Sequence, residues 1–278
     1  MERAKNLDKQ KQSKKREELG PLYGLPISLK DSFKIPGTDS SIGLACFALQ
    51  PDDRYSALPL LLLELGAVLY CKTNIPQTMM TADSDNNVFG RTLNPNNLSL
   101  TAGGSTGGEG ALIAMRGSIA GIGTDIAGSI RIPSACNGVY GFKPSAGIVP
   151  MAGQRAPVPA GFMGIEPVSG PLATSLRACH LIMENVMQAK PWLFDPDCHR
   201  LSWQALGPPK KIRVGVVYDD GLYTPNPPVR RTMAESVKKL EDAGIQVVQI
   251  QLPNILQAFL TTVQLYGADQ NKVCEAAS

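Results

Sequence analysis

The chain has 278 residues, 43% of them hydrophobic, so it can bury a sizeable core in one large domain or two small ones. Its net charge of +3 is small for this length and gives no reason to expect a nucleic acid as partner. We expect no transmembrane segment and no signal peptide, because the most apolar stretch is short and the N-terminus is charged.

The first third of the chain alternates predicted helices and strands. A polar helix is predicted over 1–19, before Gly20, and a short strand over 22–30, where apolar and small residues alternate. Residues 54–65 form an apolar helix that ends at a glycine, and 67–72 form a buried strand. This alternation is typical of an α/β protein.

Glycine-rich loops dominate the middle of the chain. Residues 83–108 are rich in Asn, Gly, Ser and Thr and predict a loop, and a helix is predicted over 109–115. A strand over 120–123 leads into the loop 124–129. Many Pro and Gly residues make 144–170 an extended surface loop, of a kind that often lines functional sites.

The last third predicts a helix over 175–187, with Thr174 as its N-cap, and then a βαβ unit. In that unit a strand over 211–218 and a strand over 245–251 flank a helix over 227–243, with Pro near the helix start and Gly after its end. The class is therefore α/β with a largely parallel or mixed sheet.

Six cysteines lie far apart and form no CxxC pair, at positions 46, 71, 136, 179, 198 and 274. A chain of this size does not need disulfides for stability. We expect reduced, mostly buried thiols in a cytoplasmic protein.

Two segments rich in glycine and serine, 103–110 and 121–131, are the candidates for chemistry. A phosphate-binding loop is disfavoured because Glu109 stands where the Walker A motif has lysine. A dinucleotide fingerprint is only half present, because Ile126 replaces the third glycine.

A serine hydrolase is the remaining interpretation, with either histidine or lysine as its base. Neither His180 nor His199 neighbours a glycine-flanked serine, although distance in sequence does not decide distance in space. Ser129 follows a glycine and Lys30 ends an apolar strand, so a buried, neutral lysine could activate that serine. Each also has a plain structural interpretation: Ser129 as a helix N-cap, and Lys30 as an exposed lysine at a strand end. The residues alone leave these interpretations open.

Several ordered blocks, which together cover nearly the whole chain, closely resemble the amidase signature family, in particular its fungal acetamidase-like and fatty acid amide hydrolase-like branches. The central blocks are 20–31, 72–77, 85–95, 103–111, 121–133 and 138–144, followed by 170–175, 191–192 and 219–221. The resemblance implies an α/β/α sandwich around a mixed, mostly parallel sheet.

The resemblance also implies a Ser-Ser-Lys triad that cleaves amides through an acyl-enzyme. Ser129 would be the nucleophile, Lys30 the base, and Ser105, in an unusual cis peptide, the serine that passes the proton between them. The further roles are an oxyanion hole, a structural pair and two pocket-lining positions. The oxyanion hole would be formed by the backbone N–H groups of Ile126, Ala127, Gly128 and Ser129. Asp125 and Arg131 would be the structural pair, and Met79 and Thr124 would line the substrate pocket.

We therefore predict an amidase for a small amide substrate, needing no metal or organic cofactor; a homodimer is compatible with the sequence. Three departures from the family pattern stand out. Ala127 replaces a common glycine, Thr106 replaces a second serine, and the single predicted domain over 1–278 lacks stretches that relatives have on both sides. A truncated, inactive fragment or pseudoenzyme is thus one alternative, and the glutaminase subunit of a tRNA-dependent amidotransferase is another.

Overall fold

A computed structural model describes residues 1–13, 15, 18–157, 164–207 and 211–267. It divides the chain into two compact units, the first containing Met1–Trp203 and the second beginning at Gln204. No helix within these ranges is both long and apolar enough to cross a bilayer.

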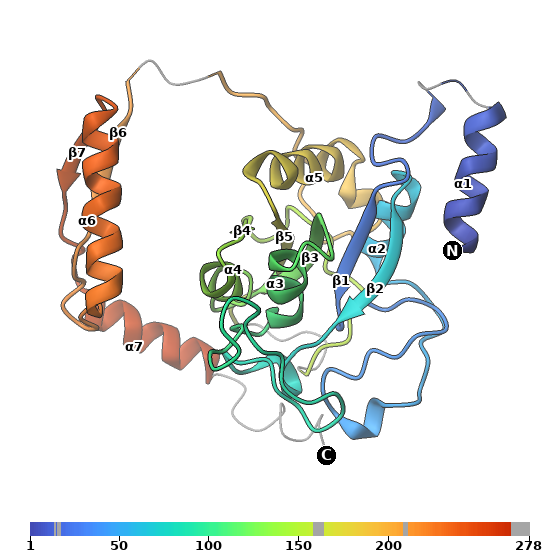
Figure 1. Cartoon of the computed structure of the whole chain (residues 1–278), viewed down its shortest axis with the longest axis horizontal. Coiled ribbons are helices and arrows are strands. Elements are labelled where there is room, and N and C mark those ends of the chain that lie inside the picture. Colours follow the sequence, from blue (N-terminus) through green and yellow to red (C-terminus); the bar gives the residue numbers. More distant parts are fainter. Residues whose placement is uncertain (14, 16–17, 158–163, 208–210, 268–278) are drawn as a thin grey trace. The chain divides into compact units, whose positions relative to one another are not determined.

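A five-stranded sheet in the order β2-β1-β3-β5-β4 forms the centre of the first unit (Figure 1). The strands are β1 (Pro26–Lys30), β2 (Val68–Thr73), β3 (Ala120–Asp125), β4 (Tyr140–Gly141) and β5 (Val168–Ala173). β1 pairs in parallel with β2 and β3, whereas β5 pairs antiparallel with both β3 and β4. Only β5 therefore runs against the other described strands of this sheet, which confirms the predicted mixed, mostly parallel sheet.

The alternation of side chains along β1 separates an apolar face of the sheet from a polar one. Ile27 and Leu29 are fully buried in the main hydrophobic core, where α2 (Ala57–Glu64) and α5 (Leu176–Gln188) cover them. Ser28 and Lys30 point to the opposite face, where α3 (Gly107–Ala114) packs, with α4 (Arg131–Asn137) against it. Helices on both faces give the expected α/β/α sandwich.

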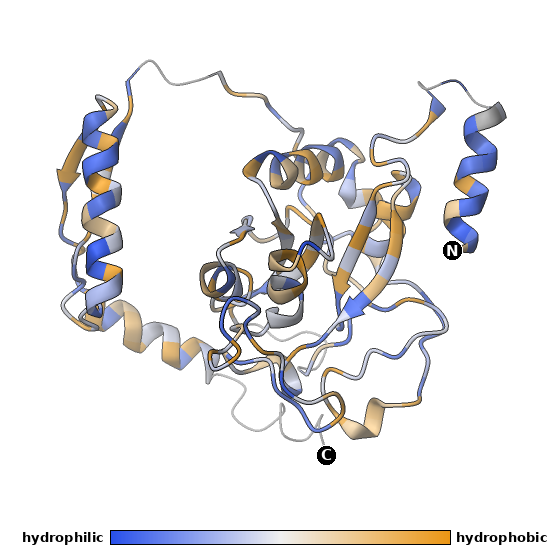
Figure 2. Cartoon of the chain, viewed as in Figure 1, coloured by the Kyte–Doolittle hydropathy of each residue, from blue (hydrophilic) through white to orange (hydrophobic). Residues whose placement is uncertain are grey.

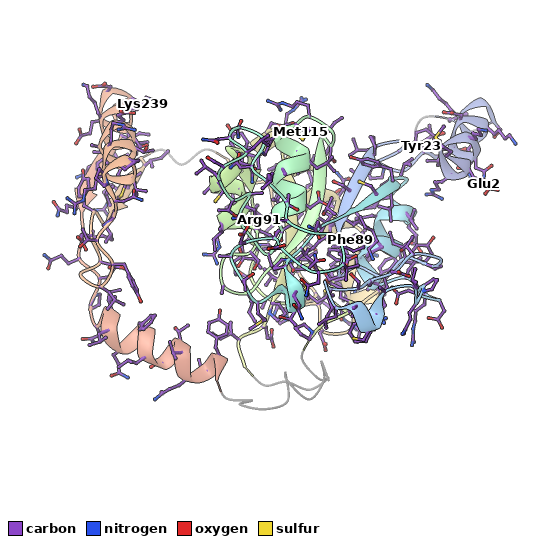
Figure 3. The ribbon with its side chains drawn as sticks, turned by 60° about the horizontal axis from the view of Figure 1, so that its bottom comes forward. Glu2, Tyr23, Phe89, Arg91, Met115 and Lys239 are labelled. Atoms are coloured by element: carbon purple, nitrogen blue, oxygen red, sulfur yellow. The ribbon has the colours of Figure 1, made fainter. Side chains whose placement is uncertain are left out.

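The helices of the first unit differ in how many of their side chains are buried. α5 carries both apolar and polar residues in Figure 2, and its buried side chains include Ile182 and Val186. α1 (Glu2–Ser13) is mostly polar, and the hydroxyl of Tyr23, labelled in Figure 3, donates a hydrogen bond to the carbonyl of its Leu7. Short 3₁₀ turns lie at Ala45–Phe47, Gln77–Met79 and Pro191–Leu193.

The second unit contains the predicted βαβ arrangement. β6 (Arg213–Val216) and β7 (Gln246–Gln249) pair in parallel, and α6 (Pro227–Asp242) connects them. The side chain of Asn226 caps α6 by accepting a hydrogen bond from the backbone N–H of Val229. A further helix, α7 (Ile255–Tyr266), follows and was not predicted.

Several predicted boundaries move in the structure. The N-cap of α5 is Ser175, one residue after the predicted Thr174, and α3 begins two residues before Glu109. β5 begins inside the predicted loop 144–170, of which residues 158–163 lie outside the described part. The predicted helix over 1–19 ends at Ser13, and residues 14, 16 and 17 are likewise not described.

The expectation that the cysteines are mostly buried is wrong for the described residues. Cys179 and Cys198 are buried, Cys71 is half-buried, and Cys46 and Cys136 are exposed. All of these are free thiols. Position 274 lies outside the described residues.

Candidate active site

Lys30, the last residue of β1, is fully buried and not the exposed strand-end lysine that was one interpretation of the sequence. Its Nζ lies 2.7 Å from Ser105 Oγ and 2.7 Å from Thr124 Oγ1. Burial lowers the pKa of Lys30 to about 7, although the nearby carboxyl groups of Asp125 and Glu109 act to raise it. The amine can therefore be neutral near neutral pH, as a general base requires.

Ser105 lies in the loop just before α3 and is joined to Gly104 by a cis peptide bond, as the resemblance implied. Its side chain is buried and aimed at Lys30. The backbone N–H of the next residue, Thr106, donates a hydrogen bond to the carbonyl of Ser129 at 3.2 Å. This bond ties the loop of Ser105 to the loop of Ser129.

Ser129 lies between β3 and α4 and is half-buried. The N-cap of α4 is Ile130, so Ser129 does not have the capping role that was its structural interpretation. Ser129 and Ser105 line one pocket of about 810 Å³. Within the described residues no direct hydrogen bond joins the two hydroxyls, and catalytic hydrogen bonds often tighten only when substrate binds.

Asp125 fixes the loop that carries Ser129. Its carboxylate accepts hydrogen bonds from the backbone N–H groups of Gly128 at 2.8 Å and Ile130 at 3.1 Å, and from the guanidinium of Arg131 at 2.9 and 3.0 Å. Burial acts to raise the pKa of Asp125, but Arg131 and the backbone donors outweigh it and hold that pKa below its usual range. The carboxylate is thus a charged anchor for the loop.

The predicted oxyanion donors differ from one another in the structure. The N–H of Gly128 points at Asp125 and is already engaged. The N–H groups of Ala127 and Ser129 donate to no oxygen in the described part of the chain. Ala127 is not among the residues with positive φ, so its methyl group is accommodated without backbone strain, whereas the following Gly128 has a φ of 129°.

The two predicted pocket-lining residues, Met79 and Thr124, both line the pocket. The hydroxyl of Thr124 also accepts a hydrogen bond from Lys30 Nζ. His199, which neighbours no glycine-flanked serine in the sequence, lines the pocket as well. No group of His, Cys, Asp or Glu side chains among the described residues could hold a metal ion.

The sequence analysis did not identify Glu109 as part of the site. This carboxyl group is fully buried, and it accepts hydrogen bonds from Ser28 and Thr73. A signal existed: Ser28 and Lys30 are two residues apart on one strand, so they share a face, and a glutamate at the start of the next packed helix could reach that face.

Comparison with known proteins gives the family. Residues 1–275 match the family model described as Amidase. An amidase of Gibberella moniliformis is 39% identical and aligns with 97% of this chain and 51% of its own length. An acetamidase of Aspergillus oryzae is 40% identical over 87% of this chain and 45% of its own length.

Solved structures of similar fold also come from this family. A fatty acid amide hydrolase superposes with a TM-score of 0.93 at 33% identity, covering 100% of this chain and 50% of that one. A bacterial aryl acylamidase of the amidase signature family superposes with a TM-score of 0.82 at 26% identity, covering 97% of this chain and 56% of that one. The chain belongs to the amidase signature family. It spans about half the length of the curated relatives it matches.

Proposed function

We propose that this chain hydrolyses amide carbon–nitrogen bonds with Ser129 as nucleophile, Lys30 as base and Ser105 as the proton relay between them. The observation that carries the proposal is the fully buried Lys30 amine, 2.7 Å from Ser105 Oγ, beside a pocket that Ser129 also lines. The hydrolases named among its relatives support an amide as the substrate.

In the first half of the reaction, neutral Lys30 takes a proton from Ser105 while Ser105 takes the proton of Ser129. The Ser129 oxygen then forms a bond to the amide carbon, and the carbonyl oxygen becomes an oxyanion. The N–H groups of Ala127 and Ser129 are oriented by the loop that Asp125 anchors, and with that of Ile126 they would donate to this oxyanion.

The oxyanion then collapses and the carbon–nitrogen bond breaks. The proton held by Lys30 returns through Ser105 to the leaving nitrogen, which departs as an amine or ammonia. A water molecule attacks the acyl-enzyme, gives one proton to the relay and takes the place of Ser129 on the acyl carbon. The relay returns that proton to Ser129, and the carboxylic acid leaves.

We expect a small aliphatic or aromatic amide as the substrate. Val149, Met79 and Ile126 contribute apolar surface to the pocket, and charged groups such as Arg155 and Glu166 also line it. The expectations of one domain over 1–278, a cytoplasmic location and a homodimer belong to this proposal. The cytoplasmic location is inferred from scattered cysteines that form no CxxC pair, and the homodimer is compatible with the sequence without being derived from it.

The test is the reactivity of Ser129 in the full chain. Folded wild-type protein should react with a fluorophosphonate probe and release ammonia from simple aliphatic or aromatic amides, and Ser129→Ala should lose both by roughly 10³-fold or more. Ser99→Ala, at an exposed loop serine, is the matched control and should keep both.

Folded wild-type protein that neither reacts with the probe nor cleaves any amide would show an inactive fragment instead. Ammonia release from glutamine only in the presence of a second subunit would favour the glutaminase alternative.

A further inference from the structure

Glu109 is a buried carboxyl group that the mechanism above does not use. It lies in the first turn of α3 and is 0% exposed. Its Oε2 accepts a hydrogen bond from Ser28 Oγ at 2.6 Å, and its Oε1 accepts one from Thr73 Oγ1 at 2.8 Å. No cationic side chain of the described residues lies within ion-pair distance of it.

The fold leaves a tailored space for this carboxyl group. Gly121 of β3 lies directly opposite, and a methyl group there would overlap Glu109 Oε2 and crowd Ser28 Oγ. Gly108, the preceding residue of α3, lets the helix approach the backbone of Asn74 so closely that a side chain would not fit. The glutamate therefore occupies a built position on the polar face of the sheet, where α3 meets β1 and β3 (Figure 1).

Lys30 shares this face with Glu109. Ser28, which holds the carboxyl group, precedes Lys30 by two residues on β1, so both side chains point to the α3 side. Two carboxyl groups act on the Lys30 amine, those of Asp125 and Glu109. The carboxylate of Asp125 is paired with the guanidinium of Arg131, whereas that of Glu109 has only hydroxyl partners.

We propose that Glu109 is a positioning residue for the lysine base: its negative charge, acting through the low-dielectric interior, raises the pH at which the amine of Lys30 becomes neutral. The inference rests on the proposed function, in which neutral Lys30 is the active form. A single buried charge is costly, so when the pair holds one titratable proton, two arrangements that are neutral in sum compete. Either the amine and the carboxyl are both uncharged, or both are charged.

The hydrogen-bond network accommodates both arrangements. An ionised Glu109 accepts from Ser28 and Thr73. A protonated Glu109 can donate to Ser28 Oγ, which lies 2.9 Å from Ser118 Oγ, and Ser118 donates to the carbonyl of Ala120 at 2.8 Å. Only Ser28 has to change its acceptor, from Glu109 to Ser118, while Ser118 donates to the carbonyl of Ala120 in both states.

The titration of both groups falls in one pH range. Burial raises the pKa of Glu109 to about 7, against the opposing effects of Ser28, Thr73 and Lys30. Lys30 titrates there too, because burial lowers its pKa to about 7. Among the described residues, Tyr70 and Cys71 of β2 also interact electrostatically with Glu109, and burial raises the pKa of each, so both remain uncharged near pH 7.

The experiment follows the Lys30 amine directly in the full chain. Lysine labelled with ¹³C at Cε is titrated by NMR, and the Lys30 signal is assigned by its loss in Lys30→Met. We expect a wild-type midpoint of about 7. Glu109→Gln removes the negative charge at nearly constant shape, so it should lower this midpoint by about one pH unit. Glu109→Asp keeps a carboxyl group and should leave the midpoint near that of the wild type.

Thr73→Val is a second variant that keeps the volume of the side chain. It removes a hydroxyl that stabilises the carboxylate, so it favours protonated Glu109 and should lower the Lys30 midpoint by a smaller amount. An unchanged or raised midpoint in Glu109→Gln, or an equal fall in Glu109→Asp, overturns the inference.

The pH dependence of fluorophosphonate labelling separates this inference from the proposed function. Wild-type labelling of Ser129 should rise with pH through about 7, where Lys30 becomes neutral, and Glu109→Gln should move this rise to lower pH. Absence of labelling in all proteins would reject the proposed function, and the NMR titration would still decide the role of Glu109.

Discussion

Asp125 shows how much one side chain contributes to the nucleophile loop. It is fully buried and binds the backbone N–H groups on both sides of Ser129. Asp125→Asn keeps the size but loses the charge, and its amide NH₂ cannot accept from those donors. We expect a loss of about 2 kcal/mol in the free energy of unfolding and a marked fall in Ser129 labelling, measured by denaturant titration and by probe kinetics.

The control for this change is Asp53→Asn, at an exposed carboxylate whose partner is the neighbouring Arg54. It should alter the free energy of unfolding by less than about 0.5 kcal/mol. Because the pKa of Asp125 is held low in the folded state, its contribution is present at neutral pH and is lost as the pH falls through that pKa. An Asp125→Asn defect that stays constant down to strongly acidic pH would contradict this account.

At the same scale, the sequence predicted which residues belong to the site better than it predicted how their side chains and backbone N–H groups are oriented. The ordered blocks brought Lys30, Ser105 and Ser129 together as candidates because the residues around them resemble those of a known family. Spacing carries no information about where an N–H points, so the engagement of Gly128 by Asp125 could not be foreseen. Glu109 was missed for a related reason, because its importance arises only when α3 packs against β1.

At the scale of elements, α5 offers a test of where a helix begins. The side chain of Ser175 accepts a hydrogen bond from the backbone N–H of Ala178 at 3.2 Å, and that of Thr174 does not cap the helix. Ser175→Ala should therefore cost about 1 kcal/mol in the free energy of unfolding, measured in denaturant, and Thr174→Ala should cost clearly less. The reverse order would place the N-cap at Thr174, as the sequence alone suggested.

Elements with strong local signals were predicted well and those without were not. The βαβ unit has β-branched strands, a proline at the helix start and a glycine after its end, and these features are local. β5 contains Gly170 and Pro171, which indicate a loop in isolation. It is a strand because it pairs with β3 and β4 on either side, a tertiary effect that outweighs local preference.

At the scale of the whole molecule, the division into two units affects how stability is measured. Unfolding of the two units need not coincide, so one free energy does not describe the whole chain. Both tryptophans of the chain, Trp192 and Trp203, lie in the first unit together with the candidate site. Tryptophan fluorescence therefore reports on the unit that contains Lys30.

The buried lysine should make the stability of this unit depend on pH in a specific way. Its pKa is lowered from 10.5 to about 7 on folding, so between these values the unfolded state binds the additional proton. The free energy of unfolding therefore rises with pH across this window. Lys30→Met removes the penalty of burying the amine, and we expect it to stabilise the first unit by about 2–4 kcal/mol at pH 7, after allowing for two lost hydrogen bonds.

This gain should shrink as the pH rises through 10.5, above which the wild-type lysine is neutral in both states, and fluorescence-detected unfolding at a series of pH values measures it. Lys5→Met, at an exposed lysine of α1, is the matched control and should show no such trend. If Lys30→Met stabilises the unit equally at pH 7 and near pH 10.5, the cost of the lysine is one of packing, and the amine is not the neutral base that the mechanism requires.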